Sequence, residues 1–215
     1  MKKQNKRDLI LDTMQSLMSQ NLASTATVSD IAKHAGIAKG GIYYYFSSKD
    51  EILDAVLERS YSQAIEKSWS LIQSKGLDAL SKVKQIFQMC VYPDIALHQK
   101  EMLTYLHLQD DLILHHKFLA LTIREFTPIL TEIIQQGEQE KSLHCEFPEQ
   151  TSEIIVSTLV FLLDHTLFSC KDSEIPKKLH ALAIMLERSM NAPEGSFDFL
   201  FSDFEPNYFS SQVNG

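Results

Sequence analysis

The chain has 215 residues, of which 44% are hydrophobic and 22% charged, and its formal net charge is −8. This length allows one large or two small domains with a buried core. No run of about 18 apolar residues suggests a membrane span, and Asp8 and Asp12 interrupt the region where a signal peptide would be apolar. Three widely spaced cysteines favour reduced thiols over a disulfide frame or a zinc site. We therefore expect a soluble, cytoplasmic protein.

The first predicted element is a helix over residues 6–20, which follows a short basic arm. Its apolar side chains recur at helical spacing and form one stripe: Leu9, Ile10, Met14, Leu17 and Met18. Asn21 suits the left-handed residue that often ends a helix. We expect this helix to pack against the two helices that follow it.

Residues 27–46 predict two short helices joined by a tight turn. Thr27 and Asp30 have the spacing of a capping box, in which each side chain accepts a backbone N–H of the other residue. Gly36 can adopt the positive φ of a turn after the first helix. The second helix begins near Lys39, and its inward positions are Ile42, Tyr45 and Phe46. This is the spacing of a helix-turn-helix.

The second helix carries an unusual set of side chains: Lys39, Gly40, Gly41, Tyr43 and Tyr44. Each glycine costs a helix interior about 1 kcal/mol relative to alanine, yet glycine suits a backbone that must approach a phosphate or a base edge closely. Tyrosine adds a flat ring and a hydroxyl that can contact phosphate or base. The pattern favours DNA contact. A packed aromatic helix with a loop lysine is the alternative.

The run AGIAKGGIYYYFSSKDEIL at residues 35–53 resembles the helix-turn-helix of TetR/AcrR-type transcriptional regulators. The resemblance rests on Ala35, Gly36, Lys39, Gly40, Gly41, Tyr43, Tyr45, Phe46, Ser48 and Lys49. It extends upstream through Asp30 and covers about the first quarter of the chain. Two positions depart from the family pattern. Ala38 replaces the usual Ser or Thr and is a poor N-cap, and Ser29 stands where many members carry Arg, which puts in doubt the strong guanine contact that an arginine would make.

The resemblance, together with these residue types, implies a set of DNA contacts. We expect Lys39, Tyr43, Tyr44 and Lys49 to contact DNA, and Thr27, Gly40 and Gly41 to offer backbone or hydroxyl contacts to phosphate. We expect Ser29 to face a base. By resemblance, the protein would be a twofold dimer that binds a palindromic operator and releases it when a small-molecule effector binds.

The charge distribution agrees with such a partner. Residues 1–49 contain seven Lys or Arg and three Asp, a net charge of +4, so the remainder carries −12 of the total −8. A basic N-terminal part on an acidic remainder orients a molecule on a polyanion. Chance variation in charge between small domains is the alternative reading, so charge supports the motif without establishing it.

The rest of the chain predicts helices throughout. Their expected ranges are 48–74, 77–91, 94–108, 112–136, 149–170 and 176–191. Pro128 predicts a kink or break, and 137–147 is expected to be a loop. The apolar character of 149–170 on nearly all sides, with the last helix, fits a four-helix bundle formed across a dimer. A core helix within a monomer is the alternative.

Two further regions are open to more than one interpretation. The acidic, phenylalanine-rich residues 193–215 fit a strap packed on the body, a disordered tail, or a short strand over 197–201. His165 beside Asp164 fits a core histidine or the floor of a ligand cavity. Side chains that could line such a cavity, or simply fill a core, are Phe87, Met89, Tyr92, Met102, Tyr105, Phe118 and Phe126.

The sequence contains no arrangement of nucleophile, acid and base that is typical of a catalytic site. We expect neither a metal nor another cofactor. We predict an all-α protein with a helix-turn-helix domain over 1–47, a helical effector-binding and dimerisation domain over 48–192, and an aromatic acidic tail over 193–215. We expect the protein to be a repressor that forms a homodimer through the last two helices of the body. The alternatives are a ligand-dependent activator, a helical ligand-binding or adaptor protein that does not read DNA, and a helical-bundle enzyme.

Overall fold

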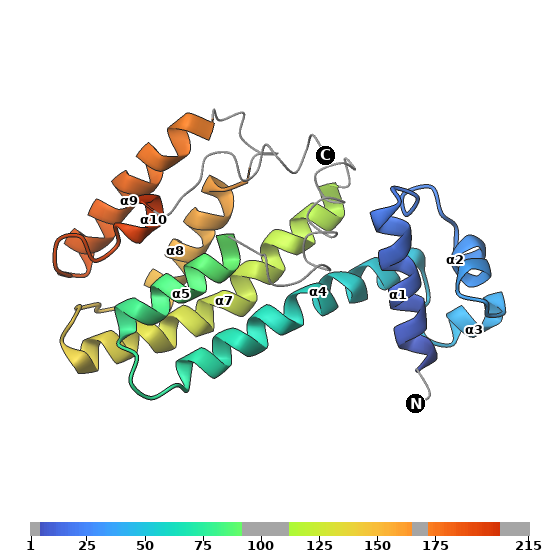
Figure 1. Cartoon of the computed structure of the whole chain (residues 1–215), viewed down its shortest axis with the longest axis horizontal. Helices are drawn as coiled ribbons and strands as arrows, with labels where there is room; N and C mark the ends of the chain where they lie inside the picture. Colours follow the sequence, from blue (N-terminus) through green and yellow to red (C-terminus); the bar gives the residue numbers. More distant parts are fainter. Residues whose placement is uncertain (1–4, 92–111, 165–171, 203–215) are drawn as a thin grey trace. The chain divides into compact units, whose positions relative to one another are not determined.

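The computed structural model describes residues 5–91, 112–164 and 172–202 (Figure 1). These residues form helices, turns and loops with no strand among them, so the all-α prediction is confirmed for them. None of the helices in these ranges is long and apolar enough to cross a membrane. The chain separates into two compact units. The N-terminal unit contains the described residues 5–63 and 112–118, and the C-terminal unit contains 64–91, 119–164 and 172–202.

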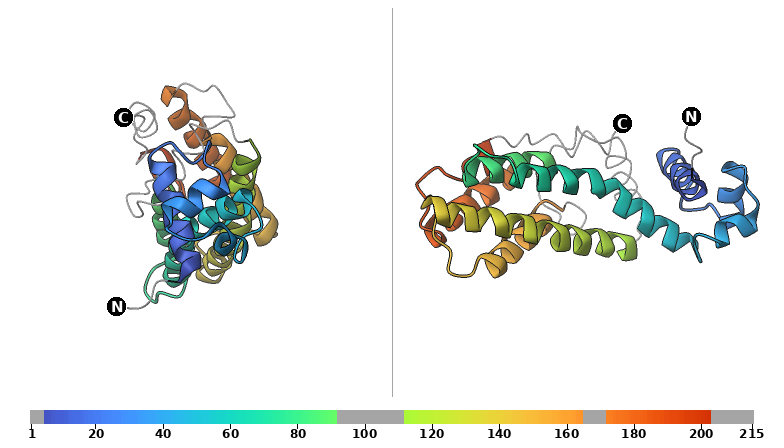
Figure 2. Two further views of the ribbon diagram at one scale, coloured as in Figure 1. Left: turned by 90° about the vertical axis from the view of Figure 1, so that its right-hand side faces the viewer. Right: turned by 90° about the horizontal axis from the view of Figure 1, so that it is seen from below.

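The N-terminal unit is built from α1 (Lys6–Ser19), α2 (Val28–His34) and α3 (Lys39–Tyr43), with the first part of α4 (Lys49–Ile72) and the first turns of α7 (Leu112–Glu140). Figures 1 and 2 show α2 and α3 beside each other. Its core consists of apolar side chains that are almost completely buried, among them Ile10, Leu11, Met14, Ile31, Ile42, Phe46, Ile52 and Val56. The predicted stripe of α1 is therefore confirmed.

Capping side chains and residues with positive φ mark where these helices begin and end. Asn5 caps α1 by accepting the N–H of Arg7 at 3.2 Å, and Asn21 follows with a φ of 57°. Gly36 turns the chain after α2 with a φ of 64°. At the start of α4 the Ser48 hydroxyl accepts the N–H of Glu51 at 3.1 Å. The carboxylate of Glu51 accepts from the N–H and hydroxyl of Ser47 (2.6 and 2.8 Å), one residue earlier than a capping box would place it.

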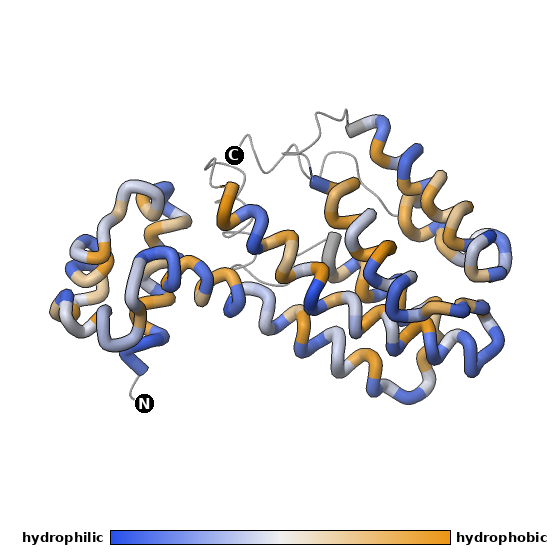
Figure 3. Tube along the Cα trace, turned by 180° about the vertical axis from the view of Figure 1, so that it is seen from behind, coloured by the Kyte–Doolittle hydropathy of each residue, from blue (hydrophilic) through white to orange (hydrophobic). Residues whose placement is uncertain are grey.

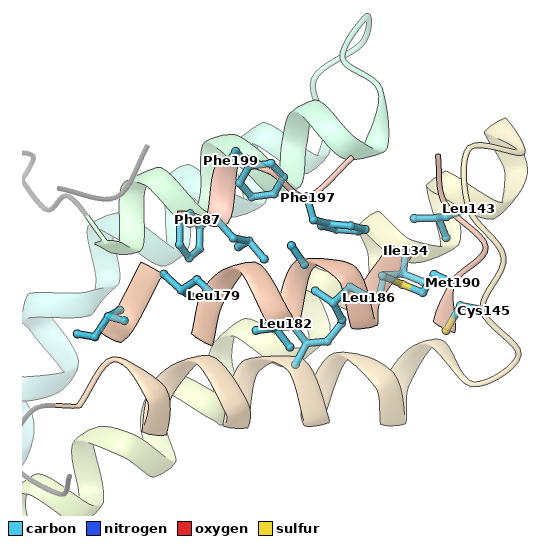
Figure 4. Packing of buried hydrophobic residues seen from close by; sticks show 14 residues of the cluster. Phe87, Ile134, Leu143, Cys145, Leu179, Leu182, Leu186, Met190, Phe197 and Phe199 are labelled. Atoms are coloured by element: carbon cyan, nitrogen blue, oxygen red, sulfur yellow. The ribbon is translucent and has the colours of Figure 1, made fainter. Parts of the chain in front are cut away.

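The C-terminal unit contains the rest of α4 and α7 together with α5 (Ala79–Val91), α8 (Pro148–Leu162), η1 (Asp172–Glu174), α9 (Ile175–Ser189) and α10 (Phe199–Ser202). Apolar and polar residues are interleaved along its helices, as amphipathic packing requires (Figure 3). One buried cluster gathers side chains from α5, α7, α9 and the residues after α9 (Figure 4). The labelled members include Phe87, Ile134, Leu179, Leu186 and Phe199.

Hydrogen bonds around the buried Lys82 connect three helices at one end of this unit. The ammonium group of Lys82, which is almost completely buried, donates to the Ile72 carbonyl at 2.6 Å and to Oε1 of Gln136 at 2.8 Å. The Gln136 amide donates to Glu140 Oε1 at 2.5 Å, and Glu140 Oε2 accepts the N–H of Ala79 at 2.9 Å. The end of α4, the start of α5 and the end of α7 are thereby tied together.

The prediction of a break at Pro128 is wrong, because α7 runs continuously from Leu112 to Glu140. Proline removes one backbone N–H, which leaves the carbonyl four residues earlier without its helical partner. Pro128 and Arg124 are both on the exposed side of the helix, where water can solvate that carbonyl. The helix therefore tolerates the proline.

The predicted loop over 137–147 begins later than expected, because α7 continues to Glu140 and the chain turns at Lys141, whose φ is 60°. Residues 141–147 lie outside any helix, as predicted. Gly137 lies where neighbours approach closely. A Cβ there would be 2.7 Å from Cγ of Leu143 and 3.2 Å from Cβ of Ala79. This glycine permits close packing against α5 and does not mark a loop.

The tail also differs from one interpretation of the sequence. The short strand predicted around 197–201 is wrong, since α10 (Phe199–Ser202) is helical. Phe197, Phe199 and Leu200 are buried, and Glu187 accepts the N–H of Phe197 at 3.2 Å. Residues 197–202 thus pack on the unit as a strap. The predicted helix 94–108, the end of 149–170, and Tyr92, Met102, Tyr105 and His165 lie outside the described residues.

Gly137→Ala is expected to destabilise the C-terminal unit by about 1 kcal/mol. Alanine gains roughly 1 kcal/mol of helix propensity, but forcing a methyl group into a filled core costs about 1–3 kcal/mol. Chemical denaturation of the purified variant measures the difference. Gly41→Ala is the matched control, because a Cβ at Gly41 meets nothing within 4 Å. Equal stabilisation by both substitutions would contradict the close packing at Gly137.

Candidate nucleic-acid interface

The five residues of α3 divide into an inward and an outward side. Ile42 is fully buried and Phe46, just after the helix, is nearly so. Lys39 and Gly40 are exposed, and the side chains of Tyr43 and Tyr44 are 50% and 81% exposed. Two aromatic rings, a cation and two glycines therefore share the solvent side of one short helix. The structure brings together the predicted residues Lys39, Gly40, Gly41, Tyr43 and Tyr44 on this surface, which we call the α3 surface.

The two glycines are not required by the packing of the chain itself. A Cβ at Gly40 or at Gly41 would have no heavy atom within 4 Å, in contrast to Gly137. Neither has a positive φ, so the backbone conformation does not demand glycine either. Glycine is nonetheless the costlier residue in a helix. The space above both positions is free for the close approach of another molecule.

The predicted capping box of α2 forms and engages the hydroxyl of Thr27. The Thr27 hydroxyl donates to Oδ2 of Asp30 at 2.6 Å and accepts the N–H of Asp30 at 3.2 Å, while the Thr27 N–H donates to Asp30 at 2.9 Å. The hydroxyl and backbone hydrogen bonds from Thr27 lower the pKa of Asp30 below its ordinary value. Thr27 therefore has a structural role at the start of α2. Ser29 is exposed in the same turn.

Lys49 also has a structural partner. Its ammonium group donates to the Ser24 carbonyl at 2.6 Å, which ties the start of α4 to the loop between α1 and α2. The Arg7 guanidinium lies over the ring of Phe46, 5.4 Å from its centroid. Hydrogen bonds from the N–H and hydroxyl of Ser47 lower the pKa of Glu51 in the neighbouring turn. These contacts fix the turn that follows α3.

Sequence reasoning missed the roles of Arg7 and Ser24. Arg7 lies in the first predicted helix, and nothing in its spacing indicated that it would stack on Phe46. Ser24 acts through its backbone carbonyl, so its side chain carries no signal at all. Ala38, by contrast, caps α3 without a side-chain hydrogen bond, as its lack of a hydroxyl predicted. Within the described ranges no group of three His, Cys, Asp or Glu side chains could hold a metal ion.

Comparisons with known proteins agree with this geometry. A family model described as "Bacterial regulatory proteins, tetR family" matches residues 10–56, and one described as "Tetracyclin repressor-like, C-terminal domain" matches residues 98–185. The fatty acid metabolism regulator protein of Bacillus subtilis (strain 168) is 30% identical over 149 residues, which are 66% of this chain and 74% of that protein.

Solved structures have the same fold. The fatty acid degradation regulator FadR from Bacillus halodurans is 26% identical with a TM-score of 0.52, over 75% of this chain and 87% of that one. The triclosan complex of SmeT, a repressor from Stenotrophomonas maltophilia, has a TM-score of 0.62 at 14% identity, over 90% of this chain and 94% of that one. With a helix-turn-helix whose outward side is open, and with both family models and these relatives in agreement, the chain belongs to the TetR family of bacterial transcriptional regulators.

Proposed function

We propose that this TetR-family regulator is a homodimeric repressor that binds a palindromic operator through the α3 surface and releases it when a small molecule binds the C-terminal unit. TetR-family members bind operator DNA, dimerise and bind small-molecule effectors. The observation that carries the proposal for this chain is the open space above Gly40 and Gly41, between an exposed lysine and two exposed tyrosines. That combination suits a helix pressed against a sugar–phosphate backbone and base edges.

The proposed contacts follow from side-chain chemistry. Lys39 would supply a charge to phosphate or a bidentate contact to guanine. Tyr43 and Tyr44 would place rings and hydroxyls against sugars, bases or phosphates. Gly40 and Gly41 would let the α3 backbone come close. Thr27, Ser29 and Lys49 are retained as candidates. Both hydrogen-bond donors of Thr27 already serve Asp30, so a phosphate contact would have to share one of them, whereas the Lys49 ammonium has more donors than the bond to Ser24 uses.

The proposed dimer surface lies on α8 and α9. Ile154 and Phe161 are seven residues apart and therefore share one side of α8, where they are 65% and 40% exposed, and Phe147, the residue before the helix, is 60% exposed. On α9, Met185 is 65% exposed. The opposite sides of both helices are buried, through Val156 on α8 and Ala183 on α9. Apolar side chains in such a row favour a protein partner over water, and in a symmetric dimer the same surface meets itself.

The proposed effector is a small organic molecule, and the relatives differ in what their names indicate. One is named for fatty acid metabolism and SmeT was solved with triclosan. An effector changes the equilibrium only if it binds the non-binding conformation of the protein more tightly than the DNA-binding one. Titrating the operator complex with fatty acids and with triclosan tests release directly.

The purified protein is expected to enrich a palindrome from fragmented genomic DNA. Twofold helix-turn-helix dimers place their recognition helices about 34–36 Å apart or at a multiple of it, so the half-sites should be separated by whole turns of DNA. Sequencing of the bound fragments provides the measurement. Weak binding without sequence preference at physiological salt would refute the repressor proposal and favour the adaptor alternative.

Gly41→Ala is expected to lower operator affinity by tenfold or more without destabilising the protein. The added methyl group meets no atom of the chain, so helix propensity should stabilise the fold by up to about 1 kcal/mol. The same methyl group would separate α3 from closely apposed DNA, at a cost of about 1–3 kcal/mol. Fluorescence anisotropy and denaturation measure the two effects. Unchanged affinity would remove the main support for the α3 surface, and Gly40→Ala repeats the test one position away.

Ile154→Asp is expected to dissociate the dimer. A carboxylate buried at the centre of an apolar interface without a partner costs at least about 2 kcal/mol. Sedimentation velocity at several protein concentrations measures the association. Leu22→Asp, at an exposed leucine of the N-terminal unit, is the control and should leave association unchanged. If Ile154→Asp associates like the unmodified protein, this side of α8 is not the dimer surface.

A further inference from the structure

The first turns of α7 belong to the N-terminal unit, although the rest of this helix belongs to the C-terminal unit. Residues 112–118 belong to the same compact unit as residues 5–63, although they lie much later in the sequence. No feature of the helix-turn-helix motif requires them. Two of their side chains contact α4, Lys117 at Asp54 and Phe118 at Tyr61.

An aromatic contact forms the buried part of this junction. The ring of Tyr61, which is only 4% exposed, meets the ring of Phe118 edge-on, with centroids 5.5 Å apart and planes at 64°. The ring of His115, also buried, lies 6.1 Å from that of Phe118. Offset and edge-on aromatic pairs at these separations are favourable beyond the area they bury.

An ion pair fixes the position of the two helices along each other. The Lys117 ammonium donates to both carboxylate oxygens of Asp54 at 2.7 Å. Asp54 and Tyr61 are seven residues apart and therefore lie on the same side of α4. Lys117 and Phe118 are adjacent in α7. We call these four residues, Asp54, Tyr61, Lys117 and Phe118, the α4–α7 junction.

The other side of the same α4 stretch is held by α1. Arg59 donates to Asp12 at 2.8 Å and to Gln15. At 100° per residue, Arg59 points well away from Asp54 and Tyr61. The segment of α4 that follows the helix-turn-helix is thus held from two directions, by α1 and by α7. Of these two contacts among the described residues, the one on the α7 side comes from outside the first 63 residues of the chain.

We propose that Lys117 and Phe118 are positioning residues for DNA binding: through the α4–α7 junction they hold α4, and with it the α3 surface, in the operator-binding arrangement without contacting DNA. This inference rests on the proposed function. Since α7 is one continuous helix, any displacement of α7 acts directly on the residues that hold α4. The junction therefore adds a second connection, besides α4 itself, between effector binding and the α3 surface.

The test compares Lys117→Gln, Asp54→Asn and the double variant by operator anisotropy at several salt concentrations, with the selected operator as probe. Loss of a half-exposed ion pair should weaken binding by a factor of about two to five. The double variant should be no weaker than either single variant, because both remove the same contact. Phe118→Leu, which keeps an apolar side chain, should weaken binding through the buried part of the junction.

The direction in which Asp54→Asn changes DNA affinity distinguishes a positioning role from an effect of net charge. This variant makes the protein less acidic, so an effect of the long-range field alone would strengthen DNA binding, whereas positioning predicts weaker binding. Lys117→Gln should leave the salt slope of log K unchanged. Lys39→Gln should lower that slope by about one if Lys39 contacts a phosphate. Lys67→Gln, at an exposed lysine of α4, is the control for loss of one positive charge.

Stronger binding by Asp54→Asn, a reduced salt slope for Lys117→Gln, or affinities equal to that of the unmodified protein would each overturn the proposal. Amide hydrogen exchange of residues 54–61 provides a readout without DNA, and these amides should exchange faster in both single variants. If the unmodified protein selects no operator, the proposed function fails. Unchanged exchange in both variants overturns the junction itself, whatever happens with DNA.

Discussion

A helix of five residues makes too few backbone hydrogen bonds to offset the entropy of forming its first turn, so it is not stable alone. The conformation of α3 therefore depends on the burial of Ile42 beneath it and of Phe46 at its end. Arg7 covers the ring of Phe46, and Glu51 accepts two hydrogen bonds from Ser47 in the turn that follows. These contacts hold α3 from its inward side and from its ends.

None of the contacts just named involves the outward side of α3. Gly40 and Gly41 lower the stability of the helix, although a Cβ at either position would meet no atom of the chain. Tyr43 and Tyr44 leave large apolar surfaces in water. A sequence selected only for stability would place alanine at the first two positions and polar residues at the others. Local rules are broken on one side of one element, which is where a binding function is expected to override them.

The N-terminal unit could be predicted in detail because its signals are local. The Thr27–Asp30 capping box, the positive φ of Gly36 and the left-handed Asn21 each depend on residues within a few positions of one another. The errors lie in the C-terminal unit, where distant residues decide. Gly137 is a packing position within α7, where Leu143 and Ala79 leave no room for a Cβ, and Pro128 is tolerated because its side of α7 is exposed.

The same distinction applies to the candidate site. Residue types and spacing placed Lys39, Gly40, Gly41, Tyr43 and Tyr44 on one surface, since a single short helix carries them all. Sequence could not show that Lys49 bonds the Ser24 carbonyl, 25 residues away, or that Lys117 pairs with Asp54, 63 residues away. A lysine at either position is equally compatible with a solvated surface, so residue type and spacing do not indicate the partner.

The ends of α4 show how such distant contacts bear on regulation. Near its start, Lys49, Asp54, Arg59 and Tyr61 hold the helix within the N-terminal unit; at its end the Ile72 carbonyl accepts from the buried ammonium of Lys82 in the C-terminal unit. Between these anchors α4 contains neither glycine nor proline. A helix without such residues has no built-in site for a sharp kink. Under the proposed mechanism, a change in packing at the Lys82 end would be passed along α4 as displacement of the whole helix, and the α4–α7 junction and Arg59 would oppose it.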